Sequence, residues 1–412
     1  MLKRIPSGSL RLGMYIHAPE GSWMDYPNWK TRFLLTDQAE LDEMRSSGVR
    51  AFFIDTGQGA DVLTAEPQPE PVATARVKQP VVLGPPVASC TAEEEFGRAE
   101  AIVAKAKQGV GLILKQARLG KAIDLGRTVP VIEDITSSIN RHPSALVSFL
   151  RMKSLDEYGY LHSVAVCALM INLGRQLLFD DETCSELGLA GLLMDIGKVA
   201  LPAELLGKPG PLSPAETAQM RQHPVRGCEL LSKSKDIPEV ALDVCLHHHE
   251  RFDGRGYGHG RRGEGISLPA RMAAVCDVYD AITSPRPYKG AAEPAEAISE
   301  MFQAQGQFDE SVLTAFIRSV GIYPIGSLVR LRSGRLGVVV EQNESELTKP
   351  RVRAFYSIAR RCRTPNEDID LSTPGEDEIL SREKPEKWGF VSWDRVWPQI
   401  LRPDMQRIFK AA

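Results

Sequence analysis

The chain has 412 residues, of which 43% are hydrophobic and 25% are charged, and its 50 Lys and Arg against 53 Asp and Glu give a formal net charge of −3. A chain of this length exceeds the size at which a single hydrophobic core keeps growing, so we expect two or three folded units. The slightly acidic balance provides no overall positive field for a phosphate backbone, which argues against a nucleic-acid polymer as a partner.

The N-terminus carries no pattern typical of a targeting or membrane segment. Lys3 and Arg4 lie between Met1 and Gly13, but no apolar stretch follows them. Nowhere in the chain do roughly 18 apolar residues occur together, which is the length that a membrane-spanning helix needs. We therefore expect a cytoplasmic protein without membrane insertion.

Residues 1–63 combine short β-like runs with one helical pattern. Leu10–His17 and Val49–Asp55 are predicted strands, and Thr36–Ser46 is a predicted helix with Thr36 as its N-cap. This combination predicts a small α+β N-terminal domain. Residues 64–91 follow with six prolines and no amphipathic period, a composition that favours an extended linker.

From residue 92 to residue 320 the apolar residues recur at helical spacing. The segment opens with Thr91-Ala-Glu-Glu94, which is a capping-box sequence. The predicted helices cover residues 92–118, 130–150, 156–178, 183–196, 213–231, 237–248, 268–283, 293–303 and 309–319. We therefore expect an all-α domain over residues 92–320.

Residues 321–412 change character again. Ser327–Arg332 and Leu336–Glu341 are rich in β-favouring residues and flank a Ser333-Gly334 turn, which predicts a hairpin within a β-rich C-terminal extension. The expected fold class is therefore mainly α, with a helical bundle between a small α+β N-terminal domain and a short β-rich C-terminal appendix.

The histidines are unevenly distributed, because six of the eight lie between residues 162 and 259. His162 belongs to the apolar stripe of residues 158–173, which faces the interior of the bundle, and Asp195 interrupts an apolar run. Each residue alone has an ordinary explanation: His162 as a hydrogen-bonded core residue, Asp195 as a buried acceptor and Lys198 as a solvated helix residue.

The run His247-His248-His249-Glu250 is harder to explain by packing. Adjacent residues on a helix point about 100° apart, so His248 and His249 reach one ion only near a helix end, or serve different faces of a site. Imidazoles and carboxylates from several helices form sites for Fe, Mn, Ni or Zn in bundle cores. The seven cysteines are scattered without a Cys-x-x-Cys pair, which argues against a thiolate zinc site and favours a catalytic metal site.

In their order along the chain, these residues resemble the motifs of the HD-GYP domains. These domains are a branch of the HD superfamily of metal-dependent phosphohydrolases, and they degrade the bacterial messenger cyclic di-GMP. The resemblance covers about residues 150–320, and residues 1–60 are similar to a small domain of unassigned function that often precedes HD-GYP domains. The matching motifs are His162-Ser163-Val164, Asp195-Ile-Gly-Lys198 with Pro202 downstream, His223-Pro224, His248-His249-Glu250-x-x-Asp253-Gly-x-Gly-Tyr257, and Asp277-Val-Tyr-Asp280-Ala followed by Arg286-Pro-Tyr-Lys289.

The resemblance implies an HD-type helical bundle and a role for each matched residue. The cofactor is expected to be one or two divalent ions, Fe or Mn with Ni or Zn as further options. Its implied ligands are His162, Asp195, His223, His248, His249 and Asp277. The implied catalytic residues are Asp195, which bridges the two metal positions, and Lys198, which stabilises phosphoryl charge, and the implied substrate-binding residues are Tyr257, Arg286 and Lys289.

Two positions depart from the family pattern. Met194 stands where the family has the His of its His-Asp pair, and Gly258 stands where it has the Pro of Gly-Tyr-Pro. A thioether is a soft, weak ligand that suits Cu(I) rather than Fe(II) or Mn(II). The metal position implied for His162, Asp195 and Asp277 therefore lacks one nitrogen donor. The change from Pro to Gly is expected to affect the stiffness of the loop more than its chemistry.

The expected function is a metal-dependent phosphodiesterase that hydrolyses cyclic di-GMP to linear pGpG, to GMP or to both, attenuated by Met194. The alternative is a catalytically degenerate module that binds cyclic di-GMP or a protein partner in signalling, and Met194 separates the two. A third alternative, a phosphohydrolase for another nucleotide, is disfavoured by the Asp-Gly-x-Gly-Tyr signature. The partners to consider are cyclic di-GMP, a signalling protein and a second copy of the chain.

Overall fold

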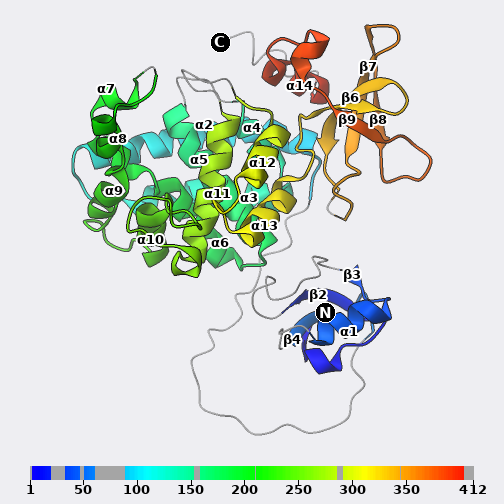
Figure 1. The fold of residues 1–412 in the computed structure, drawn as a ribbon, viewed down its shortest axis with the longest axis horizontal. Coiled ribbons are helices and arrows are strands. Elements are labelled where there is room, and N and C mark those ends of the chain that lie inside the picture. Colours follow the sequence, from blue (N-terminus) through cyan, green and yellow to red (C-terminus); the bar gives the residue numbers. More distant parts are fainter. Residues whose placement is uncertain are drawn as a thin grey trace. The chain divides into compact units, whose positions relative to one another are not determined.

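The computed structural model describes residues 2–19, 33–46, 51–60, 89–152, 158–208, 210–284, 291–343 and 345–402. The chain divides into two compact units, Met1–Pro86 and Val87–Ala412 (Figure 1). Most of the predicted linker, residues 64–91, lies outside the described residues. Within the described ranges, no helix has the length and apolar character needed to span a membrane.

In its described part, the first unit is a four-stranded antiparallel sheet with one helix. The elements are β1 (Leu2–Pro6), β2 (Tyr15–Pro19), β3 (Phe33–Leu34), α1 (Gln38–Ser46) and β4 (Ala51–Asp55), and the strand order is β1-β4-β2-β3. Ile5, Ile16, Leu41 and Phe52 are among the buried side chains of its core. The structure therefore confirms the α+β composition that the sequence predicts.

The strand predicted from Leu10 begins only at Tyr15, so this boundary was wrong. Leu10 follows a short 3₁₀ helix, and Gly13, with a φ of +85°, turns the chain before β2. The Gly13 N–H donates to Leu35 O at 2.7 Å. Leu10 and Met14 are fully buried, and their apolar character reflects burial in a turn rather than a strand.

The second unit opens with the long helix α2 (Ala92–Arg118). The capping box forms as predicted, because the Glu94 N–H donates to Thr91 Oγ1 at 3.3 Å and the Thr91 N–H donates to the Glu94 carboxylate at 3.1 Å. Phe96, Val103 and Val110 are buried on one face of the helix. This helix packs against α3, α4 and α5 (bounds below).

The remaining helices of the bundle are arranged around α5 (Figure 1). Their bounds are α3 (Val129–Arg141), α4 (Ala145–Leu150), α5 (Tyr158–Gln176), α6 (Asp181–Leu193), α7 (Ala203–Leu206), α8 (Pro214–Met220), α9 (His223–Leu231), α10 (Glu239–His247), α11 (Leu268–Thr283), α12 (Pro294–Gln303) and α13 (Glu310–Val320). Helix α5 contacts α2, α3, α4, α6, α11 and α13, and every residue from Val164 to Ile171 is buried. The predicted helical bundle is confirmed, with α5 at its centre.

Two segments predicted as single helices are each divided in two. Residues 130–150 form α3 and α4, because His142 precedes Pro143 and adopts an extended conformation. Residues 213–231 form α8 and α9, because Pro224 lacks the N–H group that a continuous helix would use. Both corrections concern helix ends and leave the bundle itself as predicted.

The described C-terminal residues form a five-stranded antiparallel sheet and a final helix. The elements are β5 (Leu328–Leu331), β6 (Arg335–Glu341), β7 (Arg351–Ser357), β8 (Cys362–Asp370), β9 (Ile379–Arg382) and α14 (Trp393–Leu401). The strand order is β8-β7-β6-β5-β9, and α14 packs against β6 and β7 (Figure 1). The predicted hairpin is present as β5 and β6, with Val329 opposite Gly337.

One hydrophobic core joins this sheet to the helical bundle. Phe96 of α2 packs edge-on against Trp397 of α14, with ring centroids 5.4 Å apart. The cluster also contains Ala145 of α4 together with Leu336 and Phe355 of the sheet. The β-rich extension therefore shares its core with the bundle.

Gly326, just before β5, shows how tightly this core is closed. Its φ is +91°, and a Cβ atom added there would lie 2.7 Å from the Trp397 ring. The neighbouring Trp393 donates its indole N–H to Gly326 O at 2.7 Å. A larger residue at this position would therefore be both strained and in collision with α14.

Candidate metal centre

Helix ends bring four of the predicted ligands together. Helix α6 ends before residue 196, its predicted end, and Asp195 leads from it into a short 3₁₀ helix. His223 is the first residue of α9, while His248 and His249 directly follow the last residue of α10. The two adjacent histidines thus leave their helix at its C-terminal end, where both can contribute to one cluster.

The first donor group, which we call the histidine-rich set, consists of Asp195, His223, His248 and His249. Their donor atoms all lie within 4.8 Å of one another. His223 Nε2 lies 3.3 Å from His248 Nε2, 3.2 Å from His249 Nε2 and 3.2 Å from Asp195 Oδ1. His223 Nδ1 donates to Met220 O at 2.8 Å, and His248 Nδ1 faces main-chain carbonyls of α10 at 3.0 Å. Because carbonyls only accept, these rings carry their proton on Nδ1 and turn an Nε2 lone pair into the cluster.

The second donor group, which we call the acidic set, consists of His162, Asp195 and Asp277. His162 Nε2 lies 3.1 Å from Asp277 Oδ1 and 3.4 Å from Asp195 Oδ2. On the other side of the same ring, His162 Nδ1 donates to Asp280 Oδ2 at 2.7 Å. Asp195 therefore directs one oxygen to each set.

The protonation of these groups suits cation binding. Burial favours the neutral form of Asp195, but the positive charge of Lys198 opposes it, and the pKa of this carboxyl lies well below its ordinary value. Burial likewise favours the neutral form of Asp277, but the contact with His162 has the larger effect and lowers the pKa of this carboxyl. Burial, together with the adjacent imidazoles, lowers the pKa of His249 well below its ordinary value. The cluster thus offers charged carboxylate oxygens and, at His249, an unprotonated imidazole.

Asp195 Oδ1 shows that the residues fit a metal ion. This oxygen is buried and, among the described residues, accepts no hydrogen bond, although His223 Nε2 lies 3.2 Å away. A buried carboxylate oxygen without a donor is costly, and the lone pair on the facing nitrogen adds repulsion. A divalent cation placed between such atoms removes both costs. The residues of the histidine-rich set therefore fit a divalent metal ion.

The two departures from the family pattern lie beside this cluster. Met194, the C-cap of α6, is fully buried next to Asp195. Gly258 has a φ of +133°, and a Cβ atom added there would lie 3.0 Å from Glu250 Oε1. Since proline requires a φ near −65°, this loop has a path that the family's Pro does not permit. The change at Gly258 therefore alters the shape of the loop as well as its stiffness.

The predicted catalytic and substrate-binding residues lie partly within the described structure. Lys198 Nζ lies 2.5 Å from Asp195 Oδ2, and its side chain is 36% exposed, so it lies on the solvent side of the cluster. The Tyr257 ring stacks on the His249 ring, with centroids 4.6 Å apart and 23° between the planes. Burial raises the pKa of Tyr257 far above its ordinary value, so its hydroxyl stays protonated. Arg286 and Lys289 lie outside the described residues.

Two residues beside the cluster had no role in the sequence analysis. Asp280 follows Asp277 by one helical turn on α11, a spacing that places both on one face and is visible in the sequence. Arg221 lies over the ring of Tyr257, with its guanidinium carbon 5.0 Å from the centroid. Its position depends on the turn between α8 and α9, and no sequence pattern distinguishes it.

His247 and His259 stay outside the cluster. His247 Nδ1 lies 2.9 Å from Asp243 Oδ1, and its ring packs against that of His259 with centroids 5.2 Å apart. Neither residue belongs to the donor groups of the described structure. His247, the first histidine of the run, therefore supports the packing of α10.

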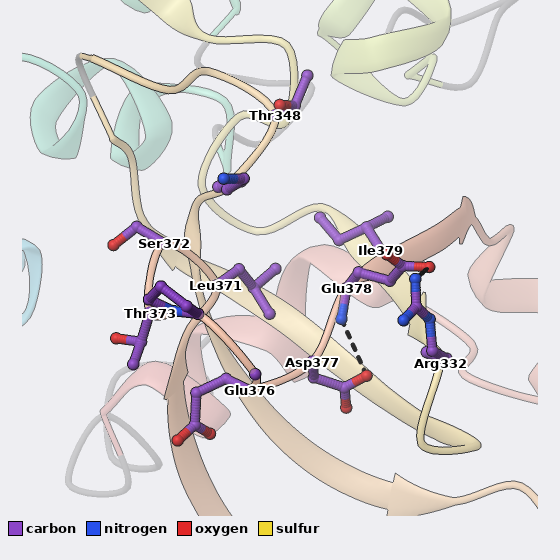
Figure 2. Close-up of a pocket in the computed structure, with 12 residues that line it drawn as sticks. Arg332, Thr348, Leu371, Ser372, Thr373, Glu376, Asp377, Glu378 and Ile379 are labelled. Carbon is purple, nitrogen blue, oxygen red and sulfur yellow. Dashed lines mark hydrogen bonds and ion pairs between the residues drawn. The ribbon is translucent and has the colours of Figure 1, made fainter.

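A pocket of about 460 Å³ lies in the C-terminal sheet, between the β5–β6 turn, the chain before β7 and the β8–β9 loop (Figure 2). Its basic residues are already paired, Arg332 with Glu378 and Lys349 with Glu346. Asp377 accepts the backbone N–H of Glu378 at 3.0 Å, as Figure 2 shows. The pocket shares no residue with the cluster around Asp195 and gives no sign of a binding function.

Two family models match the chain. Residues 130–312 match the model described as HD domain, and this match contains every residue of both donor sets. Residues 2–128 match a domain of unknown function, DUF3391, and this match extends through the first unit and past the end of α2.

Relatives with assigned activities are similar to the chain over different lengths. A cyclic di-GMP phosphodiesterase of Pseudomonas aeruginosa is 47% identical over 98% of this chain and 97% of its own length. A cyclic di-GMP phosphodiesterase response regulator of Xanthomonas campestris pv. campestris is 40% identical over 35% of this chain and 39% of its own. A 3′3′-cGAMP-specific phosphodiesterase of Vibrio cholerae is 33% identical over 40% of this chain and 38% of its own. The first of these similarities spans both units.

Proposed function

The chain belongs to the HD-GYP family of cyclic di-GMP phosphodiesterases, and from this premise we propose that it hydrolyses cyclic di-GMP at the cluster around Asp195. The observation that carries the proposal is the position of this buried carboxylate, which directs Oδ1 to the histidine-rich set and Oδ2 to the acidic set. The products are linear pGpG, GMP or both.

The two donor sets define which residues would hold the cofactor. His223, His248 and His249 with Asp195 would bind one ion, and His162, Asp195 and Asp277 the other. Divalent cations bound in this way make water acidic enough to ionise near neutral pH and offset charge on a phosphate. The free cysteines of the described structure contribute no ligand, and the mixture of imidazole and carboxylate suits Fe or Mn, with Ni or Zn as further options.

The other residues of the site act on the substrate. Lys198 is held beside Asp195 and directs a positive charge to the solvent side, where it would stabilise charge that develops on the attacked phosphate. Tyr257 keeps its proton, so it would donate a hydrogen bond or pack on a base rather than act as a general base. Arg286 and Lys289 would bind a guanine base of the dinucleotide.

The competing function is a module that binds cyclic di-GMP or a protein partner without turnover. Met194 favours it, because the acidic set has one His and two carboxylates and gains no nitrogen from the residue before Asp195. The similarity to a 3′3′-cGAMP-specific phosphodiesterase makes a second cyclic dinucleotide the alternative substrate. A cytoplasmic location, a signalling partner and a homodimer complete the proposal, and the DUF3391 region is the candidate for partner binding.

The test uses the purified full chain, its Met194→His variant and a His223→Ala control. Bound metal is counted for each protein, and hydrolysis of cyclic di-GMP and of 3′3′-cGAMP is followed. We expect the wild-type chain to hydrolyse cyclic di-GMP, Met194→His to bind more metal and react faster, and His223→Ala to be inactive.

An inert wild-type chain that gains both metal and activity through Met194→His would instead support the non-catalytic module. Binding and hydrolysis absent from both forms would exclude both functions.

A further inference from the structure

Arg221 occupies the short turn that carries the ligand His223. It is the C-cap of α8, its backbone N–H donates to Thr217 O at 3.0 Å, and α9 begins two residues later with His223. The carbonyl of the preceding residue, Met220, accepts the Nδ1 proton of His223 at 2.8 Å. The backbone of Arg221 is therefore fixed relative to the donor cluster.

The side chain of Arg221 extends over the open side of that cluster. His223 and His248 are almost completely buried, whereas the side chain of His249 is 23% exposed. Tyr257 stacks on His249, and the Arg221 guanidinium lies 5.0 Å from the centre of the Tyr257 ring. The His249 ring, the Tyr257 ring and the Arg221 guanidinium thus form a stack that leads from a proposed metal ligand to solvent. The outermost group, the guanidinium, is a cation.

The N–H groups of this guanidinium have no partner within the described residues. Among the described residues, the Arg221 side chain forms no ion pair and no hydrogen bond, and its contact is with the Tyr257 ring. Arg226, five residues further on, provides the contrast, because it donates to Ala200 O at 2.7 Å and to the Gln222 side chain at 2.6 Å. The aromatic contact orients the Arg221 plane and leaves its N–H groups free to bind an anion.

A cyclic dinucleotide needs such a group. The substrate has two phosphates, and ions in the cluster can offset charge on only the one that is being cleaved. The second phosphate must be recognised outside the cluster by fixed cations, and a guanidinium binds two phosphate oxygens at once.

We propose that Arg221, oriented by Tyr257, binds the phosphate of the cyclic dinucleotide that is not being cleaved. This inference rests on the proposed function. It assigns Arg221 to substrate affinity and not to the chemical step, so its loss should raise KM and leave kcat nearly unchanged.

The experiment compares the metal-loaded wild-type chain with Arg221→Ala, Arg221→Lys and Tyr257→Leu. A charge-assisted contact of this kind corresponds to about a 10-fold or larger rise in KM for cyclic di-GMP in Arg221→Ala, with kcat within about 3-fold. Arg221→Lys should recover part of the loss, because it keeps the charge but not the planar fork. If Tyr257 orients Arg221, the two substitutions are coupled. The double variant Arg221→Ala/Tyr257→Leu should then raise KM by less than the product of the two single-variant effects.

Arg118→Ala serves as the matched control, because it removes the same charge from the exposed end of α2 and should leave KM unchanged. Bound metal is counted in every variant. An unchanged KM in Arg221→Ala, or a fall in kcat and in bound metal with KM constant, would overturn the proposal and leave Arg221 as a support for His249. Failure of the wild-type chain to bind or hydrolyse cyclic di-GMP is read separately, from the wild type alone, and would overturn the proposed function together with this inference.

Discussion

Asp280 determines which nitrogen of His162 faces the donor cluster. Its carboxylate is 2% exposed and accepts the Nδ1 proton of His162 at 2.7 Å, which leaves Nε2 toward Asp195 and Asp277. A carboxylate behind a ligating histidine fixes the orientation of the ring and raises its basicity. Asp280 is therefore a positioning residue for the acidic set.

Substitution of Asp280 should weaken metal binding more than it weakens the fold. We expect Asp280→Ala to lower metal affinity by roughly 10- to 100-fold, and Asp280→Asn to lower it less, because an amide oxygen still accepts the Nδ1 proton. Competition with a chelator measures the affinity directly.

The matched control is Asp243→Asn, since Asp243 faces His247 Nδ1 at 2.9 Å in the same kind of pair outside the cluster. Equal metal affinity in wild-type and Asp280→Ala protein would contradict this role.

At the scale of single residues, the sequence predicts the candidate ligands better than it predicts the residues that contact and orient them. The spacing of His162, Asp195, His223 and the adjacent histidines is visible in one dimension, because each lies in a short motif. Contacts between residues far apart in the sequence are not visible in this way. Arg221 contacts Tyr257, 36 positions later, only because α8, α9 and the loop after α10 meet in space. Such contacts depend on tertiary packing, so no local pattern predicts them.

At the scale of elements, the important features are helix ends. The sequence predicts most helices of the bundle, but it misses the short helix α7 (Ala203–Leu206) and extends others through His142, through the turn before His223 and past Asp195. These are positions where local helix propensity continues while a proline or the fold interrupts the hydrogen bonding. Two of the proposed metal ligands, Asp195 and His223, lie at such interruptions, whereas His162 and Asp277 lie within α5 and α11.

Glu95 connects two of these elements. It lies in the first turn of α2, is fully buried, and accepts hydrogen bonds at 2.7 Å from both Arg141 and Ser138 of α3. Burial alone would raise the pKa of this carboxyl, but the hydrogen bonds from Arg141, Ser138 and Arg98 outweigh it and lower the pKa to about 2. The junction of α2 and α3 thus depends on an ionised Glu95.

The stabilisation from Glu95 should disappear in acid. Because its pKa is lower in the folded than in the unfolded chain, the contribution is complete above the unfolded value, near 4.5, and is lost as the pH falls towards 2. Glu95→Gln should therefore destabilise the chain by roughly 2 to 3 kcal/mol at pH 7 and by progressively less below pH 4.5. Urea unfolding across this pH range measures the difference.

Glu100→Gln, an exposed carboxylate on the same helix, is the control and should change little at any pH. A destabilisation by Glu95→Gln that stays constant down to pH 3 would show that ionisation is not its cause.

At the scale of the whole molecule, the two ends of the chain differ in how they relate to the bundle. The core of the first unit consists of its own residues, such as Ile5, Leu41 and Phe52. The C-terminal sheet instead completes a core that contains Phe96 of α2 and Ala145 of α4. The change of composition after residue 320 predicts a β-rich segment, but composition does not reveal which surface a segment covers.

This difference predicts opposite results for two truncations. A chain of residues 87–412 should fold, bind metal and hydrolyse substrate as the full chain does, because no core residue of the bundle is removed with residues 1–86. A chain that ends at residue 320 should aggregate or melt at a lower temperature, because it exposes the faces of α2 and α4 that α14 and the sheet cover. It also loses Glu341, which pairs with His142 and accepts the Ala92 N–H at 3.4 Å.

A point variant separates loss of the shared core from general effects of truncation. Trp397 is 2% exposed and contacts Phe96 of α2, so Trp397→Ala in the full chain should cost about 3 to 5 kcal/mol in unfolding free energy. Thermal melting and metal content are measured for residues 87–412, for residues 1–320 and for Trp397→Ala, each against the full wild-type chain. A chain of residues 1–320 that melts at the wild-type temperature with its full metal content would show that the bundle is complete without the sheet, and that the shared core contributes little to holding the ligands in place.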